Sequence, residues 1–259
     1  MIGGEVWMSG RETGRQPKYQ RIAAELRAAV EAGRYGPGDR LPGENDLMAE
    51  HGVARMTARQ ALGVLQAEGI AEARKGAGVF VRDFRPIRRR GIERLARARW
   101  AEGRSIWSTD IGDRELVVDS VEVTEESAPA AVAAVLGLGE DTNVCARRRR
   151  FVLDGKPVLL STSYLPAGLV AGTAITRPET GPGGTYARLA ELGHGPVRFR
   201  EEVRSRMPGV EEAERLALSA GVPVVLIART AFDAEGRAVE VNEMVLDSSA
   251  YVLEYDFEA

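Results

Sequence analysis

The sequence predicts an α+β protein built from two domains. Three observations predict this class: helical periodicity with tight glycine turns in the first part of the chain, a short basic hairpin after it, and a helix–strand–turn–strand pattern that occurs twice in the remainder. The 259 residues, 44% hydrophobic and 28% charged, have the composition of a globular protein and the length of two ordinary domains. We expect a flexible tail over 1–16, a first domain over 17–83, a basic linker over 84–94 and a second domain over 95–259.

Three helices are expected in the first domain. Ile22, Leu26 and Val30 recur every four residues and form one apolar stripe of a helix. The next two helices are short, and Gly52 between them suits a left-handed helix end. The expected helices span 18–32, 44–51 and 55–68. Two short helices joined by a tight glycine turn predict a helix-turn-helix.

A basic hairpin follows the third helix. Strands are expected over 70–74 and 79–81, around the tip Lys75-Gly76-Ala77-Gly78. The glycines let the backbone of this tip approach a phosphate or a minor groove closely. Residues 17–90 hold fourteen Lys and Arg against nine Asp and Glu, whereas the chain from Gly91 onward holds nineteen against twenty-seven. A winged helix with an excess of positive charge indicates binding to a polyanion.

Four segments of this domain form a recognisable pattern: 41–47 (LPGENDL), 52–62 (GVARMTARQAL), 65–69 (LQAEG) and the wing 74–81 (RKGAGVFV). In this order they resemble the signature of the GntR family of bacterial transcription regulators. Two positions depart from it, because Ala54 replaces the serine that usually caps the recognition helix and Gly43 replaces a serine or alanine. Loss of a hydroxyl cap costs about 0.5–2 kcal/mol of helix stability. Neither change removes a side chain that reads bases.

The resemblance implies a set of DNA contacts. Arg55 and Arg59 lie four residues apart on one helix face, and an arginine can bind guanine O6 and N7 bidentately. Thr57 can reach a phosphate or a thymine methyl group. The other candidates are Asn45, Gln60, Lys75, Gly76 and Gly78, with Lys18 as a further phosphate contact. The alternative is that Arg55 and Arg59 are ordinary solvated helix arginines.

The segment 84–94 is rich in arginine, and Pro86 interrupts any helix there. We interpret it as a domain boundary and a hinge. Its arginines are either solvated linker side chains or additional phosphate contacts beside the DNA module. Trp100 and Trp107, which follow it, could form a pocket lid or anchor the next helix.

The second domain contains an internal duplication. Each copy reads helix, glycine, strand, x-Gly turn, strand. The first copy has a helix over 128–138 and strands over 144–153 and 157–165; the second has a helix over 210–219 and strands over 224–232 and 238–246. An offset of 80 places Leu136, Val144 and Arg149 on Leu216, Val224 and Arg229. We expect the two copies to pair into one mixed antiparallel sheet with helices covering a face.

A second set of segments lies in this half: Arg149, 154–157 (DGKP), 161–166 (STSYLP), 193–194 (GH), 206–208 (RMP), 229–231 (RTA) and 236–240 (GRAVE). They resemble the UTRA domain, the effector domain of the HutC branch of GntR regulators, which has a chorismate-lyase-like fold. The resemblance implies a small-molecule effector bound between the two halves. It also implies a homodimer that binds a pseudo-palindromic double-stranded DNA operator, usually as a repressor that the effector releases.

The same resemblance indicates which residues contact the effector. Arg149 corresponds to an arginine that holds an anionic group, whereas Phe151 and Ser161 replace the arginine and glutamate of sugar-phosphate-binding members. These two departures argue against an amino-sugar phosphate. The expected effector-binding set is Arg149, Phe151, Ser161, Ser163, Tyr186, Arg229 and Glu240. Arg148 and Arg150 are expected on the opposite face of the strand.

Simpler interpretations exist for several of these residues. Glu240 could form a salt bridge with Arg229 or Arg149 instead of contacting a ligand. Tyr186 and Tyr164 could be ordinary core aromatics. His194 is followed by Gly195 and Pro196, so we interpret it as a turn residue and not as a base.

Composition also gives expectations about location, disulfide bonds, metal sites and cofactors. No apolar run approaches the roughly 18 residues that span a bilayer, and residues 1–16 have no signal-peptide pattern, so we expect no membrane partner and a cytoplasmic, nucleoid-associated location. Cys145, the only cysteine, excludes an internal disulfide. With His51 and His194 as the only histidines, we expect no metal site and no cofactor.

Three functions compete at this stage. The first is a regulator whose operator binding responds to an effector. The second is a DNA-binding regulator whose C-terminal domain only dimerises, which the altered Phe151 and Ser161 would suit. The third is an enzyme, because the resemblance includes a lyase fold; fold alone does not imply activity, and the sequence offers no nucleophile–base pair and no phosphate loop. We expect no enzymatic activity.

Overall fold

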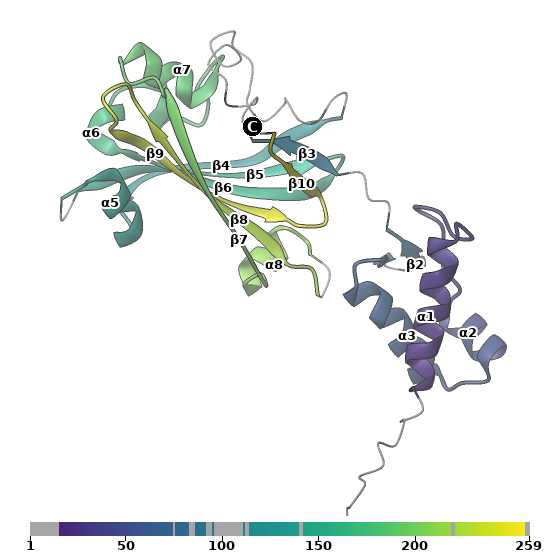
Figure 1. Cartoon of the computed structure of the whole chain (residues 1–259). Coiled ribbons are helices and arrows are strands. Elements are labelled where there is room, and N and C mark those ends of the chain that lie inside the picture. The colour runs from purple at the N-terminus through teal and green to yellow at the C-terminus, as the bar shows by residue number, and fades with distance from the viewer. Residues whose placement is uncertain are drawn as a thin grey trace, which may run out of the picture. The chain divides into compact units, whose positions relative to one another are not determined.

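The computed structural model describes residues 16–74, 76–82, 86–91, 95, 111, 114–139, 142–218 and 221–256. The chain divides into two compact units, 1–83 and 84–259, each of which is described by itself (Figure 1). The expected tail, apart from Gln16, lies outside the described residues, and so do Trp100 and Trp107.

The first unit contains three helices and a two-stranded wing. Its elements are α1 (Lys18–Glu31), α2 (Glu44–His51), α3 (Arg55–Ala67), β1 (Ala71–Arg74) and β2 (Gly78–Val81). β1 and β2 pair antiparallel, and Gly52 has the left-handed backbone (φ 58°) expected between α2 and α3. The predicted winged helix-turn-helix is confirmed.

Packing compensates for the missing hydroxyl caps of this unit. Ala54 offers α3 no side-chain hydrogen bond, but Ala61 and Leu65 of α3 are fully buried in the core of the unit. At the start of α2, the carboxylate of Asp46 accepts the backbone N–H of Gly43 at 2.9 Å. Apolar burial therefore supplies the stability of α3 that a serine cap would otherwise add.

The second unit is centred on a six-stranded antiparallel sheet of order β4–β5–β6–β9–β8–β7. The strands are β4 (Leu116–Ser127), β5 (Asn143–Leu153), β6 (Lys156–Pro166), β7 (Arg198–Arg206), β8 (Val224–Phe232) and β9 (Ala238–Asp247). The two predicted hairpins, β5–β6 and β8–β9, form the centre and meet where β6 pairs with β9. Asp154 and Gly155 both have positive φ (49° and 78°), as an Asp-Gly hairpin turn requires.

Both edge strands, β4 and β7, were missing from the sequence prediction. An edge strand pairs on one side only and tolerates charged side chains, which also protect it from pairing with another chain. Most residues of β7 are charged and exposed, so no apolar alternation marks it as a strand. Pairing with β8 over Arg198–Arg206 is what makes this segment extended.

Helices cover both faces of the sheet, which corrects the expectation that they cover one. The repeat helices α5 (Ala130–Leu136) and α8 (Val210–Arg215), with the residues that follow α8, pack on one face. Between the repeats, α6 (Ala167–Val170), the 3-10 turn η2 (Ala174–Thr176) and α7 (Gly184–Glu191) pack on the other (Figure 1). The central strands bury side chains on both faces, so each face needs a cover.

Part of the segment 84–94, for which a solvated linker and a set of phosphate contacts were the two alternatives, lies in a two-stranded parallel ribbon. β3 (Ile87–Arg90) pairs with β10 (Tyr251–Glu254), and Ile87 packs against Phe151 in an apolar cluster. The side chains of Arg88 and Arg90 point outward and bind Glu254 at 2.9 and 3.0 Å. A segment with a strand partner and a buried apolar side chain folds with the second unit, and this part of 84–94 is therefore not a solvated linker.

None of the helices in the described ranges is both long enough and apolar enough to cross a membrane.

Candidate nucleic-acid interface and ligand pocket

Two arginines project from the beginning of α3. Arg55 and Arg59 each have 60% of their side chain exposed. Arg59 Nε donates to Glu44 Oε1 at 2.7 Å, and Arg55 Nη2 donates to Asn45 Oδ1 at 3.2 Å. The structure thus places Asn45 beside Arg55 and Glu44 beside Arg59, at the junction of α2 and α3.

Glu44 is a neighbour that the sequence did not reveal. Its hydrogen bond with Arg59 lowers the pKa of the Glu44 carboxyl and raises the pKa of the Arg59 guanidinium. Glu44 also lies 3.7 Å from the Arg55 guanidinium. One carboxylate therefore orients both candidate base-reading arginines, and no local pattern links residues fifteen positions apart.

The remaining described candidates of the first unit lie on α3 and in the wing, apart from Lys18, which is the first residue of α1. Thr57 is half-buried and Gln60 is exposed. Gly76 and Gly78 have φ of 74° and 117°, a backbone that side chains with a Cβ rarely adopt. A Cβ placed on Gly78 would also lie 3.1 Å from Arg40 Nε, so the exposed Arg40 belongs to the wing although it was not predicted. Lys75 lies outside the described residues.

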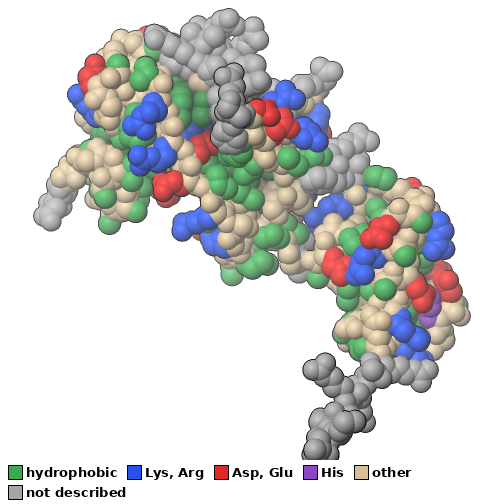
Figure 2. All heavy atoms as spheres, viewed as in Figure 1, with side chains coloured by type: hydrophobic (Ala, Val, Ile, Leu, Met, Phe, Trp, Pro, Cys, Tyr) green, Lys and Arg blue, Asp and Glu red, His purple; other side chains and the backbone are tan. Residues whose placement is uncertain are grey.

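The charge of this unit is mixed on its visible face. Figure 2 shows Lys and Arg side chains interspersed with Asp and Glu there, and no single basic patch. Net positive charge alone therefore does not locate the interface on this face. The arginines at the start of α3 do locate a candidate, because their geometry suits a groove.

A cavity of about 440 Å³ lies in the second unit, within the size range of ligand sites. Strands β4, β5, β8 and β9 and the segment leading into α7 form its walls. The side chains from these elements are Val118, Val121, Arg147, Arg149, Phe151, Tyr186, Arg229, Glu240 and Asn242, and residues 178–185 complete the lining. Five of the seven predicted residues line it: Arg149, Phe151, Tyr186, Arg229 and Glu240.

The four consecutive arginines of β5 alternate between the two faces of the sheet, as predicted. Arg147 and Arg149 face the cavity. Arg148 and Arg150 lie on the other face, where they bind Glu126 at 2.6 Å and Asp119 at 2.5 Å.

Arg149 lines the cavity and has a guanidinium group whose pKa is strongly affected by burial. Its Nη2 donates to Ser163 Oγ at 2.8 Å. Burial lowers the pKa of its guanidinium to about 10, and the nearby Glu240 opposes that shift. The group stays positively charged at neutral pH, in surroundings where charges interact strongly.

Arg147 holds the cavity wall and was not predicted. It is buried, and its two Nη atoms donate to the backbone carbonyls of Ile175, Arg177 and Pro178, the last at 3.0 Å. Burial lowers the pKa of this guanidinium. These carbonyls precede the glycine loop Gly181–Gly184, which leads into α7 and lines the cavity. Arg147 therefore fixes the segment that leads into the glycine loop and the first residues of α7, which line the cavity.

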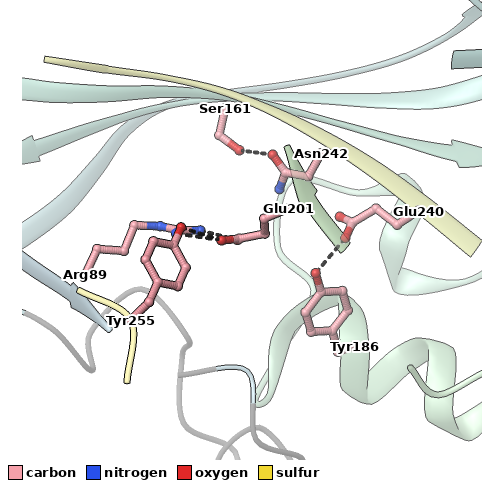
Figure 3. A network of polar contacts seen from close by, with 7 residues as sticks. All are labelled: Arg89, Ser161, Tyr186, Glu201, Glu240, Asn242 and Tyr255. Carbon is pink, nitrogen blue, oxygen red and sulfur yellow. Dashed lines mark hydrogen bonds and ion pairs between the residues drawn. The ribbon is translucent and has the colours of Figure 1, made fainter. Parts of the chain in front are cut away.

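Tyr186 and Glu240 form a buried pair in the cavity. The Tyr186 hydroxyl donates to Glu240 Oε2 at 2.7 Å (Figure 3). Burial and this neighbouring carboxylate raise the pKa of Tyr186. Tyr186 therefore belongs to the core and to the cavity wall at once, whereas Tyr164 packs in an apolar cluster with α5.

Ser161 and Ser163 lie behind the cavity residues. Ser161 Oγ donates to Asn242 Oδ1 at 2.9 Å (Figure 3). Asn242 Nδ2 donates to Ser163 Oγ at 3.0 Å. The two serines orient Asn242 and Arg149, which line the cavity. Asn242 was not predicted, although its neighbour Glu240 was.

His194 lies outside this cavity. Its Nδ1 is 3.0 Å from Asp233 Oδ2, and Asp233 also accepts the backbone N–H of Arg237 at 2.8 Å. Potential ligand atoms of His194, Asp233 and Glu235 lie within 4.8 Å of one another. The carboxylate of Asp233 is already engaged, and its bonds tie the β8–β9 turn to the segment after α7, consistent with a turn role for His194.

Comparison with known proteins gives matches over both units. Residues 18–81 match the model of bacterial regulatory proteins of the gntR family, and residues 113–252 match the UTRA domain model. An uncharacterized HTH-type transcriptional regulator of Streptomyces coelicolor is 33% identical over 251 residues, 93% of each chain. The HTH-type transcriptional repressor NagR of Bacillus subtilis is 27% identical over 91% of this chain and 92% of its own.

Solved structures agree with this match. A crystal structure of a GntR-family transcriptional regulator has a TM-score of 0.60 and 29% identity, covering 94% of this chain and 98% of that one. PhnF from Mycobacterium smegmatis has a TM-score of 0.54 and 25% identity, covering 92% and 99%.

A winged helix-turn-helix joined to a unit with a ligand-sized cavity defines a DNA-binding transcription regulator with an effector-binding domain. This chain belongs to the GntR family and carries a UTRA domain, the architecture of the HutC-like subfamily.

Proposed function

We propose that this protein is a homodimeric repressor that binds a pseudo-palindromic operator and is released when an anionic small molecule occupies the cavity. The observation that carries the ligand class is the charge of the cavity lining. Arg147, Arg149 and Arg229 contribute three guanidinium groups, against two carboxylates from Glu179 and Glu240. An excess of positive over negative groups in the lining of a half-enclosed site favours an anion.

The three cavity arginines have different roles in the proposed ligand site. Arg147 is engaged with loop carbonyls, which leaves Arg149 and Arg229 to face the ligand. The glycine loop adds backbone N–H groups at the beginning of α7, where the helix dipole also favours an anion. A carboxylate or a phosphate group fits this combination, because arginine binds both in a planar, bidentate manner.

Glu240 indicates a second feature of the ligand. Its Oε2 accepts from Tyr186, and its carboxylate lines the cavity with capacity for further hydrogen bonds. We propose that a hydroxyl or amine of the ligand donates to it. The ligand would then combine an acid group with a donor group.

DNA contact in this proposal falls on the start of α3 and on the wing. Arg55, Thr57, Arg59 and Asn45 read bases, whereas Gln60, Lys75, Gly76 and Gly78 contact the backbone. NagR, a relative of similar length, is named a repressor, which supports repression as the mode of action. We place the protein in the cytoplasm, on the nucleoid, where such a regulator finds DNA.

The deciding experiment is a footprint of the purified protein on DNA upstream of its own gene, repeated with pooled metabolite fractions. A protected pseudo-palindrome that one fraction weakens supports both halves of the proposal. Arg149→Gln should keep the footprint and lose the response. Arg148→Gln is the matched control, since that side chain lies on the opposite sheet face and should leave the response intact.

Two other functions give different outcomes. A C-terminal domain that only dimerises predicts a footprint that no fraction weakens and that Arg149→Gln does not alter. An enzyme predicts turnover of the bound metabolite. We propose that none occurs, because the described cavity residues include neither a histidine nor a cysteine that could act with a serine hydroxyl.

A further inference from the structure

A buried ion pair anchors β3 to the edge of the sheet. Arg89 is 1% exposed, and its two Nη atoms donate to the Glu201 carboxylate, with Nη1 to Oε2 at 2.9 Å. The Tyr255 hydroxyl lies 3.4 Å from the same Oε2 (Figure 3). Gly91 follows β3, and a Cβ there would collide with the Tyr255 ring. The side chains of Arg89, Glu201 and Tyr255 are therefore packed closely against one another.

Glu201 also belongs to a row of polar residues that crosses the sheet. In the strand register, Glu201 of β7 lies directly opposite Arg229 of β8, and Arg229 lies opposite Asn242 of β9. Directly opposite residues in antiparallel strands point to the same face, with Cβ atoms about 4.5–5.5 Å apart. Arg229 and Asn242 line the cavity. The carboxylate that holds Arg89 is thus a direct cross-strand neighbour of a cavity cation.

The position of β3 in the chain shows why the contact between Glu201 and Arg89 matters. The first compact unit ends at Asp83, and β3 begins at Ile87, so β3 is the first described strand after the DNA-binding unit. The backbone of β3 is held by β10, with the Ile87 N–H donating to Ala250 at 2.7 Å and the Gly91 N–H donating to Glu254 at 3.0 Å. Its buried side chains are Ile87 and Arg89. Glu201 therefore binds the buried charged side chain of this strand.

We propose that Glu201 is a positioning residue that couples the cavity to β3 by sharing its charge between Arg229 and Arg89. An anion in the cavity neutralises Arg229, so the Glu201 carboxylate no longer divides its attraction between two arginines, binds Arg89 more strongly and holds β3 more firmly. The strand that is held more firmly is the first described strand that follows the first unit in the sequence. This inference rests on the proposed function for its physiological meaning, but the coupling itself is testable without any ligand.

The test is amide hydrogen exchange on the full-length protein, read at Ile87 and Gly91. Arg229→Gln removes the charge as a bound anion would. We expect it to raise protection of these two amides by at least about fivefold, the low end of allosteric couplings. In a Glu201→Gln background the same substitution should have no effect. Glu202→Gln is the matched control, because Glu202 is the next residue on β7 and points to the opposite face.

Each result of the hydrogen-exchange experiment either supports or overturns the proposed coupling between the cavity and β3. Equal protection in wild type and Arg229→Gln overturns it, and so does an equal rise with and without Glu201. If Arg229→Gln loosens the whole sheet, which exchange in β5 and β6 would reveal, Arg229→Met provides a neutral side chain of similar length for the same cycle. Failure of inorganic phosphate to bind the wild type more tightly than Arg149→Gln would contradict the anionic cavity, and the exchange result would still decide the role of Glu201.

Discussion

Arg147 and Arg149 lie two positions apart on the same face of β5, yet their guanidinium groups have different partners. Arg147 donates to three backbone carbonyls of the cavity wall, whereas Arg149 donates to Ser163 and faces the cavity with Arg229. At the start of α3, Arg59 donates to Glu44, whereas Arg55 donates to Asn45. The role of each arginine thus follows from its partners.

Arg59→Ala should abolish specific operator binding while leaving the fold intact. The side chain is exposed, so its loss creates no cavity, but one bidentate arginine–guanine contact is worth about 1–3 kcal/mol of discrimination. Footprinting and competition with unrelated DNA measure this. Arg59→Lys, which keeps the charge, should retain non-specific binding. An Arg59→Ala protein that protects the same site with unchanged affinity would refute the assignment.

Effector affinity should fall at high pH through Arg149. Only the protonated guanidinium attracts an anion, and burial lowers the pKa of this group to about 10. Affinity should therefore stay level from neutral pH to about one unit below that value and decline as pH passes it. Calorimetric titration with the effector identified by footprinting checks this. Arg149→Gln should bind weakly without that decline; an equal decline in the variant would assign it to another group.

At the scale of elements, turn residues and apolar periodicity in the sequence predicted most of the helices and strands. The hairpins β5–β6 and β8–β9 and the helices α1, α2 and α3 follow local signals, and the structure confirms them. The strand β4 does carry such a signal, since Val121 and Val123 alternate with polar residues, and the prediction missed it. The strands β7 and β3 carry none, because most of their residues are charged. They form because another segment, distant in sequence, supplies the backbone hydrogen bonds.

Gly155→Ala should destabilise the second unit by about 1–2 kcal/mol, the cost of a left-handed backbone for a residue with a Cβ. Gly155 has φ 78° in the β5–β6 turn. Gly168 is the matched control: it lies in α6, has no positive φ and has open space around a new Cβ, so Gly168→Ala should be neutral or slightly stabilising. Urea unfolding of both variants compares them; equal stabilities would show that the turn tolerates a Cβ.

At the scale of the molecule, the two compact units carry separate binding surfaces on one chain. Coupling between them requires that each ligand distinguish two states of the protein. The region that joins the units includes β3, whose Arg89 is bound by Glu201. Neither domain by itself therefore explains regulation.

Thermal unfolding should show two transitions that respond to different ligands. The effector at about 100 times its Kd should stabilise the second unit by about 2.7 kcal/mol, whereas operator DNA should raise the transition of the first. Calorimetry with each ligand separately measures this, and Arg149→Gln should remove the effector's shift alone. A single transition that both ligands raise equally would contradict independent unfolding of the units.

The sequence by itself determined the family, the winged helix-turn-helix, both central hairpins and five residues of the cavity lining. The helices and hairpins follow from short-range rules, namely helical spacing, glycine turns and strand alternation. The family and the cavity residues follow from the resemblance of ordered motifs to a known family. Only the tertiary structure decided that Arg147 holds the cavity wall and that Arg89 binds Glu201, 112 positions away. It also decided that helices cover both faces of the sheet. The physical reason is that such contacts depend on which strands pair and in which register, and no local pattern in a single sequence records that pairing.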